Sequence, residues 1–115
     1  MRAGGLRRLA ASGRMIDSVA SMFVLALEVD LHVNESRSLK AKRQVVKSIV
    51  DTARHRFGVS AAEVGDQDLW QRATLGFAVV ASSEGHAVEV MDGVDRLVWS
   101  YTQVDVLSTD RRWLE

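Results

Sequence analysis

Apolar side chains alternate with other residues without a break from Met22 to Val33, and this alternation limits the possible folds more than any other feature. One set of positions reads Phe, Leu, Leu, Val, Leu and Val, whereas the other set includes Glu28, Asp30 and His32. Successive side chains of a strand point to opposite faces, so this pattern predicts a long strand with one buried face. The fold must therefore contain a sheet that is covered on one side.

The remaining pattern predicts two amphipathic helices and three further strands. Ser38 is a suitable N-cap for a helix whose apolar residues recur at helical spacing as far as Phe57, and Gly58 is placed to end it. Ser83 begins a second helix, whose apolar side runs from Ala87 to Tyr101. The further strands are expected at Val59–Val64, Ala73–Ser82 and Gln103–Ser108, and a charged tail follows the last of them.

The order strand, helix, strand, strand, helix, strand predicts an α+β fold, the ferredoxin-like βαββαβ sandwich. Right-handed crossovers place both helices on one face of a four-stranded antiparallel sheet. Residues 22–115 are long enough for one such domain and too short for two cores. This topology also brings the start of the first helix, residues 37–43, to the same end of the domain as the Gly65–Arg72 connection.

Residues 1–21 differ from the rest because they hold four arginines, three glycines and a single acid, Asp17. We expect a disordered N-terminal extension outside the domain, arising from translation that starts upstream of Met22. The alternative is a basic arm that touches nucleic acid. The segment lacks the uninterrupted apolar core of a signal peptide.

Composition excludes several kinds of chemistry. The chain has no cysteine, which removes disulfides, thiolate nucleophiles and cysteine-bound metals. His32, His55 and His86 are scattered, and no phosphate-binding loop, dinucleotide fingerprint or catalytic spacing accompanies them. No apolar run reaches the roughly 18–20 residues of a membrane span. We therefore expect a protein that does not span a membrane, is not an enzyme and needs no cofactor.

Charge is distributed unevenly although the net charge is zero. Residues 35–58 hold seven basic and two acidic side chains, a balance of +5, whereas residues 59–115 hold four basic and ten acidic ones, a balance of −6. Cations at a helix start oppose the helix dipole, typically by 0.3–1 kcal/mol each. They suit a phosphate there, because free backbone N–H groups lie beside them. The predicted nucleic-acid or phosphate site consists of Arg37, Lys40, Lys42, Arg43, Arg72 and Trp70.

Each of these residues also has a structural interpretation, which the sequence leaves open. Asp66 and Asp68 would pair with the cations and tie the loop down. The stem of Lys42 would lie on apolar neighbours, with its head at the end of the domain. Trp70 would cover the edge of the core instead of stacking on a base.

The sheet face away from the helices offers two further alternatives. Glu28, Asp30 and His32 project from it, but three groups spaced along one strand are a poor metal site, so no metal is predicted. Small apolar residues occupy the rest of that face, which favours burial by a partner, and self-association into a homo-oligomer is the hypothesis. These residues are Val24, Ala26, Gly76, Ala78 and Val80.

Two segments resemble the signature segments of the YlxP-like family of small bacterial proteins, a domain of unknown function. They are SLKAKR at 38–43 and AEVGDQDLWQRATLG at 62–76, and the resemblance extends over nearly everything after Met22. It implies a ferredoxin-like fold, a cytoplasmic location and work related to RNA or the ribosome, with no catalytic residue or cofactor. The preferred function is a non-enzymatic RNA- or ribosome-associated accessory protein. The alternative is a protein–protein adaptor or oligomerisation module that uses the open sheet face.

Overall fold

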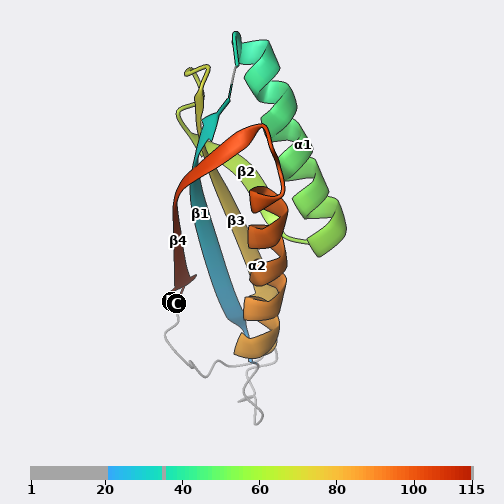
Figure 1. Ribbon diagram of the computed structural model, residues 1–115. Coiled ribbons are helices and arrows are strands. Elements are labelled where there is room, and N and C mark those ends of the chain that lie inside the picture. The colour runs from blue at the N-terminus through green and yellow to red at the C-terminus, as the bar shows by residue number, and fades with distance from the viewer. Residues whose placement is uncertain (1–20, 35, 115) are drawn as a thin grey trace, which may run out of the picture.

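A computed structural model describes residues 21–34 and 36–114. They form a two-layer α+β sandwich. Four antiparallel strands form one sheet in the order β2-β3-β1-β4, and both helices cover the same face of it (Figure 1). The predicted βαββαβ arrangement is confirmed. The predicted N-terminal extension, residues 1–21, lies outside the described residues except for Ser21. The elements are β1 (Phe23–Val33), α1 (Leu39–Phe57), β2 (Ser60–Gly65), β3 (Arg72–Ala81), α2 (Glu84–Trp99) and β4 (Val104–Leu114).

Strand β1 lies in the middle of the sheet and supplies the centre of the core. It pairs with β3 on one side and β4 on the other along almost its whole length. Its alternate residues from Leu25 to Val33 are buried to 2% exposure or less, against helix residues such as Ile49 and Met91. The other set faces away from the helices, onto what we call the open face.

The helices begin and end where local chemistry permits. The Ser38 hydroxyl accepts a hydrogen bond from the Ala41 N–H, and Gly58 adopts the left-handed conformation, φ +66°, that ends α1. Helix α2 stops at Trp99, so Tyr101 lies in the following turn and not on the helix as the pattern predicted.

Gly93 allows the two helices to approach each other closely. It is buried on α2 beneath the ring of Phe57, at the end of α1. A Cβ atom at this position would lie 2.4 Å from Phe57 Cε1, which is well inside van der Waals contact. The glycine therefore weakens α2 locally and improves the packing between the helices.

We expect Gly93→Ala to destabilise the protein by about 1–2 kcal/mol, because overpacking a core outweighs the ~0.5–1 kcal/mol that alanine adds to helix propensity. Gly85→Ala is the matched control in the same helix, since a Cβ there meets nothing within 4 Å. It should leave stability unchanged or raise it slightly. Urea denaturation of both variants measures the difference, and a stabilised Gly93→Ala protein would contradict this packing account.

Strand β4 is longer than the sequence predicts. The expected strand Gln103–Ser108 and charged tail are replaced by a single strand that continues to Leu114. The reason is that β1 offers a free edge along its whole length, and backbone pairing with Val24 and Leu25 holds the end of the chain despite its charged side chains. Charged residues on an edge strand discourage further pairing, which explains why this segment does not resemble a strand in composition.

An irregularity in β4 decides which side chains face the helices. Leu31 pairs with Val106 and Asp30 with Ser108, so Leu107 is an extra residue that reverses the alternation. Arg111 consequently lies on the helix side, where its Nη1 is 2.8 Å from a carboxylate oxygen of Asp92 on α2.

Among the described residues no helix is long and apolar enough to cross a membrane.

Candidate nucleic-acid interface

Two segments far apart in the chain meet at what we call the upper end, residues 36–43 and 66–71 (top of Figure 1). The Lys42 Nζ atom donates hydrogen bonds to the main-chain oxygens of Asp66 and Gln67, at 2.8 and 3.1 Å. The Gln71 amide donates to the Ser36 carbonyl at 3.3 Å. The predicted juxtaposition of the start of α1 with the β2–β3 loop is therefore present.

Lys42 is the most buried charged side chain of this region, with no exposed surface. Besides the two loop carbonyls, its ammonium donates to Glu63 Oε2 at 2.8 Å and to the Arg72 carbonyl at 3.1 Å. Three N–H bonds thus serve four acceptors. The interpretation of Lys42 as a structural residue holds, and we remove it from the phosphate-binding set because no proton remains for a ligand.

Glu63 is the partner that sequence reasoning missed. Its side chain lies on the helix side of β2, opposite Leu75, and is 15% exposed. The signal was present in the alternation of β2, which places an acid among buried neighbours where only a cation makes it tolerable. Together, Lys42 and Glu63 form a buried ion pair that closes the upper end of the core.

This ion pair fixes the shape of the β2–β3 loop. Asp66 adopts a left-handed conformation, φ +60°, which Asp tolerates better than most residues, and the Leu69 N–H donates back to its carbonyl at 3.1 Å. The loop presents Leu69 and Trp70 to solvent, 50% and 55% exposed. Trp70 therefore does not cover the core, and its ring is available to a partner.

Arg37, Lys40 and Arg43 are exposed in the segment that contacts this loop through Ser36 and Lys42. No acid lies in the first turn of α1, and none of the three forms an ion pair with a residue that the structure describes. Their charges oppose the helix dipole without local compensation. They form the cationic part of the candidate site.

Two basic residues further along α1 are paired with an acid. Lys47 and Arg54 both contact the Asp51 carboxylate, and Arg54 also donates to the Ala61 carbonyl at 2.6 Å. The hydrogen bond from Lys47 is the main reason why the pKa of Asp51 lies below its ordinary value. Arg56, in the last turn of α1, forms no ion pair with a described residue and lies 5.9 Å from the centroid of the Phe57 ring.

The prediction that Asp66 and Asp68 hold the loop by pairing with the exposed cations is wrong, because other atoms make the contact. The main-chain oxygen of Asp66 makes the contact, and the cation is the buried Lys42. Within the described ranges neither carboxylate forms an ion pair with Lys40 or Arg43, and both aspartates are exposed. They moderate the positive potential of the upper end without cancelling a particular cation.

Arg72 does not belong to the site in the way that the sequence suggested. Its side chain crosses the open face and donates to Asp30 Oδ2 at 2.8 Å, because β3 pairs with β1 so that these residues share a face. Only its carbonyl takes part in the upper end, as an acceptor for Lys42. We therefore omit Arg72 from the cationic set.

The polar residues of β1 are engaged with neighbours. Asp30 contacts Arg72, Glu28 lies 3.8 Å from Arg112, and the His32 ring bonds to the Asn34 amide oxygen at 2.9 Å. Over the part of the chain that the structure describes, no three His, Cys, Asp or Glu side chains are grouped to hold a metal ion. Asp30 and Glu28 are thus paired with arginines of the neighbouring strands.

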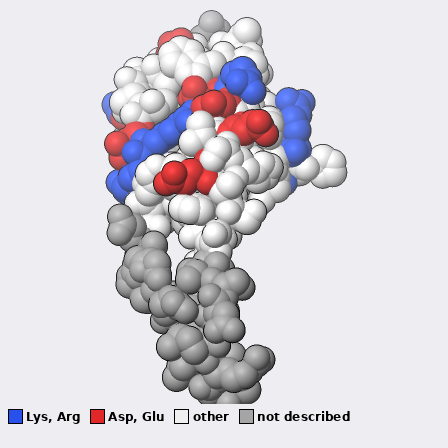
Figure 2. Space-filling view, turned by 90° about the horizontal axis from the view of Figure 1, so that it is seen from below, with Lys and Arg blue, Asp and Glu red and all other residues white. Residues whose placement is uncertain are grey.

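The opposite end of the molecule has a different character. Seen from below, its described surface shows acidic and basic side chains interspersed, with neither sign forming a separate patch (Figure 2). The upper end, by contrast, combines the exposed Trp70 with three exposed cations that form no ion pair with a described residue.

Comparison with known proteins places the chain in a family. The family model described as "Protein of unknown function (DUF503)" matches residues 24–111. Over 86 residues the chain is 33% identical to "Uncharacterized protein YlxP" of Bacillus subtilis (strain 168), which covers 75% of this chain and 94% of that relative. Both segments of the upper end fall inside the matched range, and the predicted YlxP-like resemblance is confirmed.

Proposed function

This chain belongs to the family described as Protein of unknown function (DUF503), and from the geometry of its upper end we propose that it is a non-enzymatic accessory protein that binds single-stranded RNA. Arg37, Lys40 and Arg43 contact phosphates, and Trp70 stacks on an unpaired base. The observation that carries the proposal is the exposed Trp70 on a loop that a buried charge holds in place.

The fixed loop favours binding because little order has to be gained when a partner arrives. Burying the Lys42 ammonium is costly unless every acceptor is well placed, and here two of its four acceptors are carbonyls of the loop. The chain thus uses a buried charge to hold an exposed aromatic ring. A base that stacks on such a ring contributes roughly 1–3 kcal/mol.

The cations supply the second part of the recognition. A phosphate near the first turn of α1 would meet the side chains of Lys40 and Arg43 and the positive end of the helix dipole. The dipole penalty that these cations carry in the free protein is then offset in the complex. Stacking and phosphate contacts together suit a single strand, whose bases are accessible, better than a duplex.

A protein–protein adaptor that works through the same loop is the competing function, because an exposed tryptophan also suits a protein interface. Salt separates the two. Three phosphate contacts predict that log K for a single strand falls with log salt at a slope of about −2, whereas an apolar interface responds weakly.

We expect Trp70→Ala to weaken binding of a labelled oligouridine of about ten nucleotides roughly tenfold to a hundredfold, with the salt slope unchanged. Fluorescence anisotropy measures both quantities. Trp99→Ala is the matched control, since Trp99 is 60% exposed on α2, and it should bind as the wild type does. Equal affinity of the wild type and Trp70→Ala, or no binding of single-stranded RNA at low salt, would rule the proposal out.

A further inference from the structure

The β2–β3 loop carries an acid whose side chain has no polar contact with the described part of the chain. Asp68 is exposed, and its carboxylate forms neither an ion pair nor a hydrogen bond with a residue that the structure describes. The two glutamines of the loop, by contrast, are engaged. The amides of Gln67 and Gln71 donate to the main-chain oxygens of Glu63 and Ser36, both at 3.3 Å. Asp68 therefore offers an unused acceptor to a partner.

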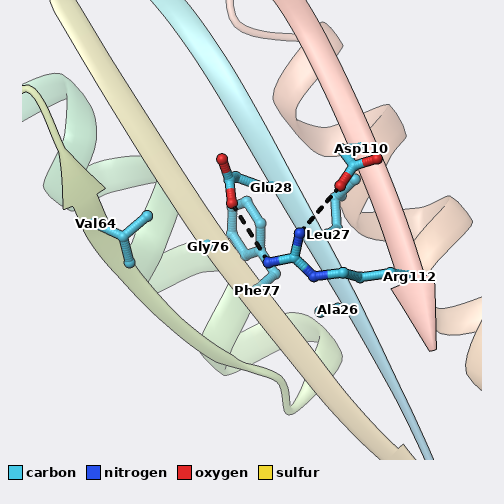
Figure 3. Close-up of a pocket in the computed structure, with 8 residues that line it drawn as sticks. All are labelled: Ala26, Leu27, Glu28, Val64, Gly76, Phe77, Asp110 and Arg112. Atoms are coloured by element: carbon cyan, nitrogen blue, oxygen red, sulfur yellow. Dashed lines mark hydrogen bonds and ion pairs between the residues drawn. The ribbon is translucent and has the colours of Figure 1, made fainter. Parts of the chain in front are cut away.

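Acids on the open face are used differently. There Arg112 reaches between Glu28 and Asp110, at 3.8 and 3.3 Å from their carboxylate oxygens (Figure 3). Three exposed cations lie in the segment that contacts the β2–β3 loop, yet none of them pairs with Asp68 among the described residues. An unpaired carboxylate at a site for phosphates repels them. Its presence is explained if it contacts another part of the nucleotide.

Asp68 lies close to the proposed stacking ring, on a backbone whose shape is fixed. The Leu69 N–H donates to the Asp66 carbonyl at 3.1 Å, which closes a turn that has Asp68 as its third residue. The Lys42 ammonium binds the first two carbonyls of this turn, at 2.8 and 3.1 Å. Trp70 follows two residues after Asp68, so their Cα atoms are roughly 7 Å apart at most. A base that stacks on the Trp70 ring can thus present an edge to the carboxylate.

A carboxylate distinguishes bases by the donors on their edges. It has two acceptor oxygens and no donor, so it pairs best with two neighbouring N–H groups. Guanine presents such a pair, N1–H and the 2-amino group, on the Watson–Crick edge that an unpaired base exposes. Adenine and cytosine each present one amino group there, next to an acceptor nitrogen, and uracil presents one N–H between two carbonyls.

We propose that Asp68 determines specificity at the upper end and makes guanine the preferred base on Trp70. The inference rests on the proposed function, since it concerns the base that stacks there. Two N–H···O bonds from guanine give the Asp68 carboxylate the donors that it lacks in the free protein, and they offset its repulsion of the phosphates. The loop then combines a ring on which any base can stack with a carboxylate that distinguishes among bases.

Labelled strands of about ten uridines, with G, A, C or U at one central position, test this inference by fluorescence anisotropy. We expect the wild type to bind the guanine strand about tenfold more tightly than the adenine strand, within the range of one bidentate pair. Adenine is also a purine with a large stacking surface, so this comparison separates the edge contact from stacking.

Asp68→Asn should lose the preference for guanine and bind the adenine strand at least as tightly. The reason is that a carboxamide offers one donor and one acceptor, which match adenine. Asp66→Asn is the matched control, because it removes the same charge from the same loop and because Asn tolerates the left-handed conformation of this residue. It should bind all four strands slightly more tightly and keep the preference for guanine. Both side chains are exposed, and circular dichroism checks that both variants fold.

The outcomes separate this inference from the proposed function. If the four strands bind with equal affinity while Trp70→Ala still weakens them, the role of Asp68 is overturned and the RNA site stands. A guanine preference that survives in Asp68→Asn, or that is lost equally in Asp66→Asn, overturns the role of Asp68 as well. If no strand binds at low salt, both proposals fail.

Discussion

Lys42→Met should destabilise the protein by about 3–5 kcal/mol, the largest loss of stability that we expect from a single substitution on α1. Methionine retains the apolar stem but leaves the Glu63 carboxylate and three main-chain oxygens without their donor. A domain of this size has only about 5–15 kcal/mol in total. Chemical denaturation gives the free energy of unfolding, and hydrogen exchange in residues 66–72 should increase more than elsewhere.

Lys40→Met is the control for this experiment. Lys40 lies on the same helix but is exposed and unpaired among the described residues, so its loss should change stability by no more than about 0.5 kcal/mol. The double variant Lys42→Met/Glu63→Gln should lose less than the sum of the two single variants, because no buried charge is left alone. Additive effects would show that the two side chains are not energetically coupled.

Reversing two charges at the upper end, Lys40→Glu/Arg43→Glu, should reduce the affinity for single-stranded RNA at least about a hundredfold. The change removes two phosphate contacts and adds repulsion at the same place. It should leave the free energy of unfolding nearly unchanged or raise it slightly, since acids suit a helix start. Anisotropy titrations at low salt measure the affinity, and denaturation measures the stability.

Lys47→Glu/Arg56→Glu changes the net charge by the same amount on the same helix, beyond its first two turns. If binding depends on the upper end, this variant retains most of its affinity apart from a modest long-range effect. If binding instead follows net charge alone, both double variants lose affinity equally, and the site assigned to Arg37, Lys40 and Arg43 has no support.

The fold was predictable because its strongest signals are local. A few residues suffice to predict β1 from its alternation, and the helix ends from Ser38, Ser83 and Gly58. The order of the elements then allows few topologies. The end of β4 was not predictable, since its pairing depends on the free edge of β1 and its faces depend on the extra residue Leu107. From composition alone, the charged residues after Ser108 are predicted to be a solvent-exposed tail.

The candidate site was predictable in its place but not in its atoms. Topology predicted that the start of α1 lies beside the β2–β3 loop, and the hydrogen bonds of Lys42 to that loop agree. Basic residues close together in the sequence differ in burial, because each residue of a helix is rotated by about 100° from the one before it. Lys40 and Arg43 are exposed for this reason, whereas Lys42 is buried. Arg72 looked cationic and free in the sequence, whereas its partner Asp30 is 42 residues away and meets it only through strand pairing.

The donors on Lys42 end mainly on backbone carbonyls, and every residue has one. The conformation of the β2–β3 loop therefore depends little on which side chains stand at positions 68–70, between the two glutamines whose amides bond to main-chain oxygens. Other side chains can be grafted onto this rigid turn, and it would serve as a scaffold on which binding preference is changed without remaking the domain.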